Sequence, residues 1–467
     1  MSEAVDVRGG TIWTMVWWGL KNSQKFISNL ILTRLLPPEV FGIAAIGNTL
    51  ISGISMFSDF GVQQNIVRSK RSDAEFYQTA WTVQLIRGFA LTLVIMLLAQ
   101  PLATFYGIDN LAVFLFIVAA SNLAMGFNNV EVLRDFRHAK LQRIAIIDNV
   151  AALVGLVVMS IWAWFSPSYV ALAVGALVST ATFAVGSMLA YPRNDCRLRL
   201  ERDAVAELVG FGKWVLISTI LAFATSQMDR LALGKLIPLQ LLGLYSIAWI
   251  WASLPNQMLE QWAGKVFFPL ASQHDRANSD GSTITTARRT YVAVACVSTA
   301  VIYAVSDILV TMLYTEAYQG VALLMRQLSV VFLLYTIEQS YSHLLIAKGR
   351  PRDKILGQAL SIAVFAIGLL PVFETMGLEG VIGLLAATAV VRIVWMAYQL
   401  SGFRAFELAF DMACVGMFYL IACSLHAAVG AFDSRWYQVV VASAMGASAL
   451  LVAMAGYLHL RRTCERT

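Results

Sequence analysis

Apolar runs of about twenty residues recur along the whole chain, separated by short polar or charged segments. A helix needs about 20 apolar residues to cross the roughly 30 Å hydrocarbon core of a bilayer. Only 13% of the 467 residues are charged, whereas a soluble domain carries about 25%. The chain therefore cannot cover a water-facing surface of its own size. We expect an all-α integral membrane protein whose partner is the lipid bilayer.

Breaks at Pro, Gly and charge clusters predict fourteen transmembrane helices. Their approximate ranges are 11–35, 40–62, 76–100, 110–130, 144–165, 169–191, 208–235, 240–263, 291–314, 320–346, 355–373, 378–400, 410–430 and 436–459. Lys and Arg gather in alternate loops, while Lys235 and Arg435 lie on the opposite side. Such basic loops stay in the cytoplasm, so both termini are predicted to be cytoplasmic. The longest soluble stretch is predicted at 264–290.

The net charge of +6 does not indicate a nucleic-acid partner, because the positive charge follows this alternation of loops. Motifs for nucleotide hydrolysis, for a serine nucleophile and for zinc binding are missing from the sequence. The cysteines show no metal-ligand spacing. We therefore expect a protein that is not an enzyme and has no cofactor, metal site or catalytic residues. The glycines of 175–186 are interpreted as positions of close helix packing.

Two segments resemble each other at an offset of 201 residues: 34–43 (RLLPPEVFGI) and 235–244 (KLIPLQLLGL). The same offset aligns Trp13 with Trp214. A simple Leu-Pro hairpin would also produce this likeness. If the repeat is real, helices 1–6 and 7–12 are parallel copies. The expected architecture is two pseudo-symmetric six-helix lobes around a central cleft, at 1–200 and 201–402, followed by two extra helices at 403–467.

Charged side chains inside the membrane indicate where a site lies, because lipid is a poor neighbour for them. In the first predicted helix, Lys21, Lys25 and Asn29 share one face, with Trp18 and Asn22 beside them. Two lysines one turn apart repel each other, so a hydrated cavity that binds an anion would explain the pair. The alternative is that both lysines extend toward the cytoplasmic edge.

Other predicted helices also carry charges in their apolar segments. These residues are Arg87, Asp148, Asp229, Arg230, Arg326, Glu338 and Arg392. Arg87 and Arg230 are candidates to face the cavity. Glu338 is the best-placed acid for coupling to an ion or a proton, and Asp229 and Asp148 are further candidates. A structural hydrogen bond between helices would explain Glu338 equally well.

Several segments resemble one known family. They are 32–43 (LTRLLPPEVFGI), 57–67 (FSDFGVQQNIV), 134–140 (RDFRHAK), 211–214 (FGKW) and 347–350 (AKGR). Together they are similar to bacterial polysaccharide transporters, the oligosaccharide-lipid flippases of the multidrug/oligosaccharidyl-lipid/polysaccharide superfamily. The resemblance extends over nearly the whole chain, although each motif is loose.

This resemblance implies a flippase in the bacterial inner membrane that works by alternating access. Its implied substrate is an oligosaccharide on undecaprenyl diphosphate, destined for exopolysaccharide, capsule or O-antigen (lipopolysaccharide). Lys21, Lys25 and Arg87 would hold the diphosphate, while Trp18, Asn22 and Asn29 would meet the sugars. A polysaccharide polymerase and export machinery are further implied partners.

Three other functions fit parts of the sequence. An ion-coupled multidrug-type exporter would share the fold, but it would favour acidic residues in its cavity. A membrane-embedded polysaccharide polymerase or ligase would be expected to carry a large periplasmic loop, which the predicted topology lacks. A structural scaffold would have no reason to keep Lys21 and Lys25 in a membrane helix.

Overall fold

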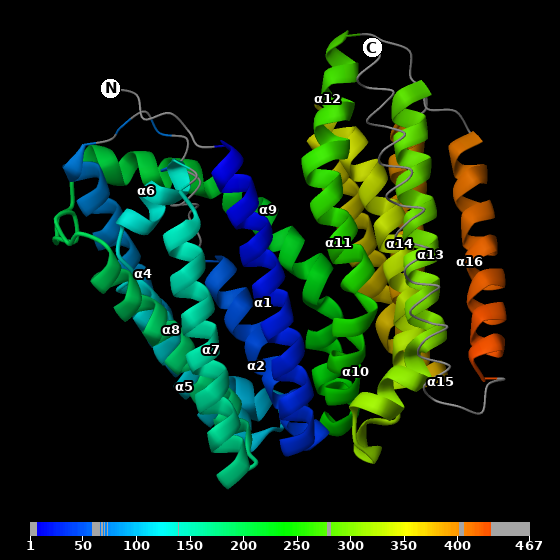
Figure 1. Ribbon diagram of the computed structural model, residues 1–467, viewed down its shortest axis with the longest axis horizontal. Coiled ribbons are helices and arrows are strands. Elements are labelled where there is room, and N and C mark those ends of the chain that lie inside the picture. Colours follow the sequence, from blue (N-terminus) through cyan, green and yellow to red (C-terminus); the bar gives the residue numbers. More distant parts are fainter. Residues whose placement is uncertain are drawn as a thin grey trace. The chain divides into compact units, whose positions relative to one another are not determined.

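The computed structural model describes residues 7–57, 66, 69, 71, 73–138, 140–277, 282–400 and 406–430. Within these ranges it does not describe the side chains of 7–16, 18, 208–218, 273–277, 282, 406–408, 423 and 425–430. All regular secondary structure in the described residues is helical (Figure 1), which confirms the all-α class. The chain forms two compact units, Met1–Gly243 and Leu244–Thr467. The proposed division at residues 200 and 402 stays a prediction.

The first unit is a helical bundle. Its helices are α1 (Val7–Leu35), α2 (Pro38–Phe57), α4 (Ala74–Tyr106), α5 (Asp109–Gly126), α6 (Glu131–Arg137), α7 (Gln142–Phe165), α8 (Tyr169–Ala190) and α9 (Arg202–Leu236). The first turns of α10 (Leu239–Ala252) also belong to this unit. Helix α1 packs on α7, and α2 packs on α9. These two contacts involve α1, α7 and α9, the helices that carry most of the predicted site residues of this unit.

The second unit contains the rest of α10 and a second set of helices. These are α11 (Leu254–Trp262), a π-helical turn (Ala263–Phe267), α12 (Phe268–Ala277), α13 (Ser282–Leu313), α14 (Val321–Ala347), α15 (Pro351–Gln399) and α16 (Phe406–Gly430). Helix α14 packs against both α13 and α15, and α16 packs on α13. This places α14 in the centre of the unit.

Eight of the described helices are long and apolar enough to cross a membrane. Helices occupy most of the described residues in the predicted ranges from 11–35 to 410–430, while the fourteenth range, 436–459, lies outside the described residues. The chain is thus a multi-pass helical membrane protein, and the number of fourteen crossings stays a prediction.

Helix α15 contains two predicted spans. At a rise of 1.5 Å per residue its 49 residues would extend about 74 Å, more than twice the hydrocarbon thickness. The helix is interrupted at Gly377, where φ is 61° and ψ is −145°. Glycine takes this left-handed φ without a Cβ penalty. The flanking Glu374 and Glu379 make the interruption polar, as expected for a turn at a membrane surface.

The stretch 264–290 was predicted as a soluble loop, and its described residues are helical; its position outside the membrane stays a prediction. The π-turn and α12 continue to Ala277, and α13 begins at Ser282. Apolar residues at helical spacing explain the difference. Ala263, Phe267 and Ala271 are buried in the π-turn and α12, and Ala287 and Tyr291 are buried in α13. Their burial stabilises helix where charge alone suggested a loop.

Glycines permit close helix contacts in the first unit. A Cβ on Gly175 would collide with Met159 of α7, and one on Gly186 would collide with Ile147. This confirms the packing interpretation of 175–186. The two segments that resemble each other also touch. A Cβ on Gly42 would overlap the carbonyl oxygen of Leu239, and a Cβ on Gly243 would overlap that of Pro38.

Candidate functional site

The centre of the candidate site is an ion pair between α1 and α7. The Lys21 ammonium lies 2.7 Å from Asp148 Oδ2, and the Trp17 indole N–H donates to the same oxygen at 2.7 Å. The Lys21 ammonium also lies 5.8 Å from the centre of the Trp17 ring. One turn further, Gln24 donates to the Asn149 carbonyl at 3.1 Å. Asp148 therefore balances the charge of Lys21.

Lys25 lies one turn from Lys21 and has a different environment. Its side chain is exposed, and among the described residues it forms no hydrogen bond or ion pair. Asn22 and Asn29 are half-buried on the same helix, whereas the Trp18 side chain lies outside the described residues. The α1 face therefore holds two cations and one nearby anion.

Arg87 is positioned at the contact between α4 and α2. Its guanidinium donates to the Ser55 carbonyl at 3.0 Å. Gln84, one turn earlier, donates to the carbonyls of Met125, Gly126 and Asn128 at the end of α5. The hydrogen bond attaches Arg87 to the C-terminal half of α2.

Arg230 belongs to a polar surface shared by α9 and α2. Gln227 Oε1 accepts from Arg230 at 2.9 Å and from the Thr49 hydroxyl at 3.4 Å. The adjacent Asp229 is 2% exposed and points into the unit. Asn48 and Ser52, four residues apart on α2, are exposed. Sequence analysis missed Gln227, Asn48 and Ser52, although exposed polar residues four apart in an apolar helix give a detectable signal.

In the second unit, Glu338 lies beside Arg392. The distance from Glu338 Oε2 to Arg392 Nε is 3.6 Å, with exposed fractions of 13% and 3% for the two side chains. Arg392 also donates to Ser361 Oγ at 3.2 Å and lies 5.1 Å from the Tyr335 ring. The structure thus gives the predicted coupling acid a buried cationic neighbour.

A second buried ion pair was missed because Arg288 was placed in a cytoplasmic loop. Arg288 on α13 is fully buried and lies 2.5 Å from Asp411 on α16. The Tyr341 hydroxyl donates to the same carboxylate at 2.6 Å, and its ring lies 4.2 Å from the guanidinium. This cluster connects α13, α14 and α16 and points to a structural role.

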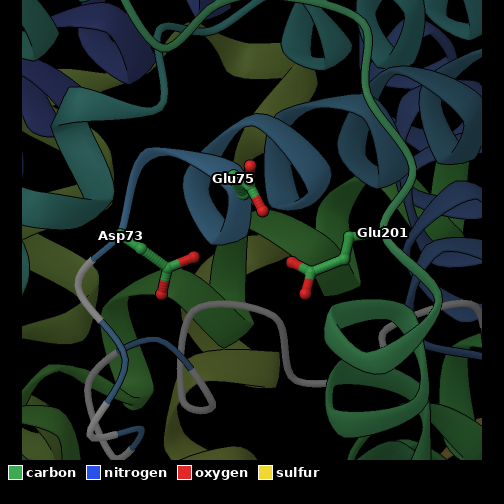
Figure 2. Close-up of side chains that lie close together, drawn as sticks. All are labelled: Asp73, Glu75 and Glu201. Carbon is green, nitrogen blue, oxygen red and sulfur yellow. The ribbon is translucent and has the colours of Figure 1, made fainter.

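Three acidic side chains gather at the start of α4 (Figure 2). The carboxylates of Asp73, Glu75 and Glu201 offer oxygens within 4.8 Å of one another. Arg71 lies 2.7 Å from both Asp73 and Glu201, and Arg199 lies 2.5 Å from Glu75. The Arg71 guanidinium lowers the pKa of Asp73 to about 2. Because arginines engage all three carboxylates, the group is an ion-pair network at the junction of α4 and α9.

Comparisons with known proteins agree with the fold and with a membrane role. A family described as "Polysaccharide biosynthesis protein" matches residues 31–323, more than half of the chain. The chain belongs to this family. This confirms the family resemblance seen in the sequence motifs.

Two curated relatives match part of the chain. The succinoglycan biosynthesis transport protein ExoT of Rhizobium meliloti (strain 1021) is 25% identical over 277 residues, covering 58% of this chain and 56% of that protein. The lipopolysaccharide biosynthesis protein WzxC of Escherichia coli (strain K12) is 21% identical over 278 residues, covering 58% and 55%. The match spans little more than half of either relative.

Solved structures share the fold over a larger region. The lipid II flippase MurJ in an inward closed conformation superposes with a TM-score of 0.71 at 11% identity, covering 97% of this chain and 99% of that chain. An inward-facing multidrug resistance MATE family transporter of the MOP superfamily gives 0.61 at 15% identity, covering 80% and 94%. Both likenesses show that the chain shares its fold with these proteins.

Proposed function

We propose that the protein is a flippase for undecaprenyl-diphosphate-linked oligosaccharide in the bacterial inner membrane. It moves the substrate from the cytoplasmic to the periplasmic leaflet, for synthesis of an exopolysaccharide, capsule or O-antigen. Membership of a polysaccharide biosynthesis family and a fold shared with a flippase support this class of activity.

The observation that carries the proposal is the exposed, unbalanced charge of Lys25. A lysine near the bilayer centre costs roughly 2.5–3.5 kcal/mol on insertion scales, and within the described residues no acid forms an ion pair with it. Lys21, one turn away, has Asp148 as its counter-ion. A diphosphate bearing two or more negative charges would pair with Lys25 and compete with Asp148 for Lys21. Lys25 thus binds the anion directly, and Lys21 can exchange its ion pair with Asp148 for one with the substrate.

Polar groups nearby suit the rest of the headgroup. Asn22 and Asn29 on α1, with Trp18, are proposed to contact the sugars next to the diphosphate. Arg87 and Arg230 are proposed to add positive charge to the same cavity, although their described partners are Ser55 and Gln227.

Transport is proposed to use alternating access of two six-helix lobes, 1–200 and 201–402, with both termini cytoplasmic. Glu338 is the proposed acid for coupling to an ion or a proton, because it is 13% exposed and lies 3.6 Å from Arg392. Asp229 and Asp148 are further candidates. A polysaccharide polymerase and export machinery would act on the delivered substrate.

The test is flipping of a fluorescent undecaprenyl-diphosphate oligosaccharide in proteoliposomes, measured by an impermeant quencher. Lys25→Ala should slow flipping by about ten- to a hundredfold, and Lys25→Arg should retain most of the rate, because one charge-assisted contact contributes about 1.5–3 kcal/mol. Lys348→Ala, which removes a lysine from a predicted cytoplasmic loop, is the matched control. Equal rates for wild type and Lys25→Ala would reject the site.

A multidrug-type exporter is the second candidate, supported by the fold shared with a MATE transporter. A cationic substrate would be repelled by Lys25, so the α1 face favours the flippase. If wild type moves no lipid-linked glycan under ion gradients but extrudes a cationic dye, the exporter replaces the flippase. A polymerase would instead lengthen the glycan, which chromatography of the recovered lipid would detect.

A further inference from the structure

Helix α11 has a buried face and an exposed face, and the exposed face carries three polar residues and Met258. Pro255 and Asn256 are buried, whereas Gln257, Glu260 and Gln261 are exposed. These residues lie in the last part of the predicted span 240–263, and exposed Lys265 continues their row after another turn. Amides and charges in such a position avoid lipid and face water or a polar ligand.

A π-helical turn fixes this face in place. Trp262 and Phe267 stack on Tyr291, with ring centres 5.8 and 6.2 Å away and ring planes inclined by 18° and 12°. Residues five apart in an α-helix point about 140° away from each other, so both could not reach one ring. The i→i+5 bonding of Ala263–Phe267 brings them to the same side. The exposed row is thereby held opposite the aromatic stack.

Hydrogen bonds hold the back of α11 as well. The Asn256 amide donates to Thr336 Oγ1 at 2.9 Å and to Gln339 Oε1 at 3.4 Å, both on α14. The Tyr291 hydroxyl donates to the same Gln339 oxygen at 3.3 Å. A rigid backing keeps the exposed side chains at fixed positions, as a binding surface requires.

The chemistry of the exposed face fits hydroxyl groups. The Gln261 amide offers two N–H donors and one oxygen acceptor. Gln257 donates one N–H to Ser253 Oγ at 2.7 Å and offers its second N–H and its oxygen. Both amides therefore complement a hydroxyl that donates and accepts. Among the described residues, Glu260 and Gln261 form no hydrogen bond or ion pair. Glu260 and Lys265 carry opposite charges, so the face has no net charge to attract an ion of either sign.

We propose that the α11 face, formed by Gln257, Glu260, Gln261 and Lys265, binds the neutral, hydroxyl-rich part of a lipid-linked glycan. This inference rests on the proposed flippase function and adds a sugar-binding surface in the second unit.

The test compares two carriers in proteoliposomes: the lipid diphosphate with one sugar, and the same lipid with a neutral oligosaccharide. Each carries a fluorophore on its last sugar. The variant Gln257→Leu/Gln261→Leu should slow the oligosaccharide about tenfold, as expected for two lost hydrogen bonds, and leave the single-sugar carrier within about twofold. Gln319→Leu, an exposed glutamine outside the α11 face, is the matched control and should change neither rate.

Equal slowing of both carriers would overturn the inference, since it would mean general damage to the protein. Unchanged rates for both carriers would also overturn it. If wild type moves neither carrier, the proposed function itself fails, and this outcome is distinct from the other two. Glu260→Gln should preserve oligosaccharide flipping, because an amide still bonds to hydroxyls; its loss would indicate a cationic ligand instead.

Discussion

At the scale of single residues, Asp148 determines how much positive charge the α1 face presents. It accepts hydrogen bonds from both Trp17 and Lys21 at 2.7 Å, and an incoming anion must compete with it. Asp148→Asn should therefore tighten the binding of inorganic pyrophosphate. We expect the dissociation constant to fall about three- to tenfold, which corresponds to a gain in binding free energy of up to about 1.4 kcal/mol. Isothermal titration of the purified protein in detergent measures this.

Asp307→Asn is the matched control for Asp148→Asn. It removes a carboxylate that lies 2.7 Å from Arg326 in the second unit, and pyrophosphate affinity should stay unchanged. Weaker binding in Asp148→Asn would contradict the competition and would identify Asp148 as a support for the site.

Asp73 should make stability depend on pH in the acid range. Its pKa is about 2, below the ordinary value of 3.8, because Arg71 donates to it. The ionised group stabilises the folded state above pH 3.8, and this contribution is lost as pH falls toward 2. Asp73→Asn removes the charge but can still cap α4, where Asp73 accepts from the Phe76 N–H.

Thermal unfolding of both proteins in detergent measures this pH effect. Wild type should have the higher melting temperature above pH 5, and the difference should narrow between pH 4 and pH 2. The effect should be small, since the Asp73 side chain is 44% exposed and water screens the pair. A difference that widens with acid would contradict the assignment.

Sequence reasoning at the residue scale identified charges but not their partners. Lys21, Asp148, Glu338 and Arg392 were recognised as intramembrane charges, yet the pairing of Lys21 with Asp148 depends on α1 packing on α7. That contact joins residues 127 positions apart, and helical periodicity cannot predict it. Arg288 was misplaced because a basic residue near a predicted loop resembles a solvated one. Asp411 and Tyr341 on other helices account for its burial.

At the scale of elements, the two segments that resemble each other, 34–43 and 235–244, meet where α2 contacts the first turns of α10. Gly42 meets the carbonyl of Leu239, and Gly243 meets that of Pro38. The partners correspond at the same offset of 201 residues. Gly42→Ala or Gly243→Ala should therefore lower stability by about 1–3 kcal/mol through overpacking, seen as a lower melting temperature in detergent.

Gly383→Ala in α15 is the matched control. A Cβ there meets no atom within 4 Å, and alanine favours helix by about 0.5–1 kcal/mol over glycine. Its melting temperature should stay equal or rise. Unchanged stability in both Gly42→Ala and Gly243→Ala would mean that α2 and α10 are not in close contact.

The helices themselves were predictable where hydropathy was continuous. Sequence reasoning placed helices at 144–165 and 169–191, and the structure has α7 and α8 at Gln142–Phe165 and Tyr169–Ala190. It failed at 264–290, where buried Ala263, Phe267 and Ala271 follow helical spacing beneath polar residues. The π-turn was also unpredictable, because it accompanies the stacking of Trp262 and Phe267 on Tyr291, a contact between distant parts of the sequence.

At the scale of the whole molecule, the alternation of basic loops predicts the membrane topology. Helix α15 provides a direct test, since its 49 residues contain two predicted crossings. The chain before it carries Lys348, Arg350, Arg352 and Lys354, which predicts a cytoplasmic start. The interruption at Gly377 must then lie on the periplasmic side. A periplasmic position for Gly377 would determine which end of each neighbouring helix lies in the cytoplasm.

Cysteine labelling in cells tests this topology. In a background without the native cysteines, Met376→Cys should react with an impermeant maleimide from outside, because Met376 is 68% exposed beside Gly377. Lys348→Cys, also exposed, should react after the membrane is permeabilised and not before. The reverse pattern would invert the chain and move the basic loops to the periplasm. Labelling of both sites from one side would mean that α15 does not cross the membrane twice. The chain would then have one predicted crossing fewer, and every loop that follows α15 would lie on the opposite side of the membrane from its predicted side.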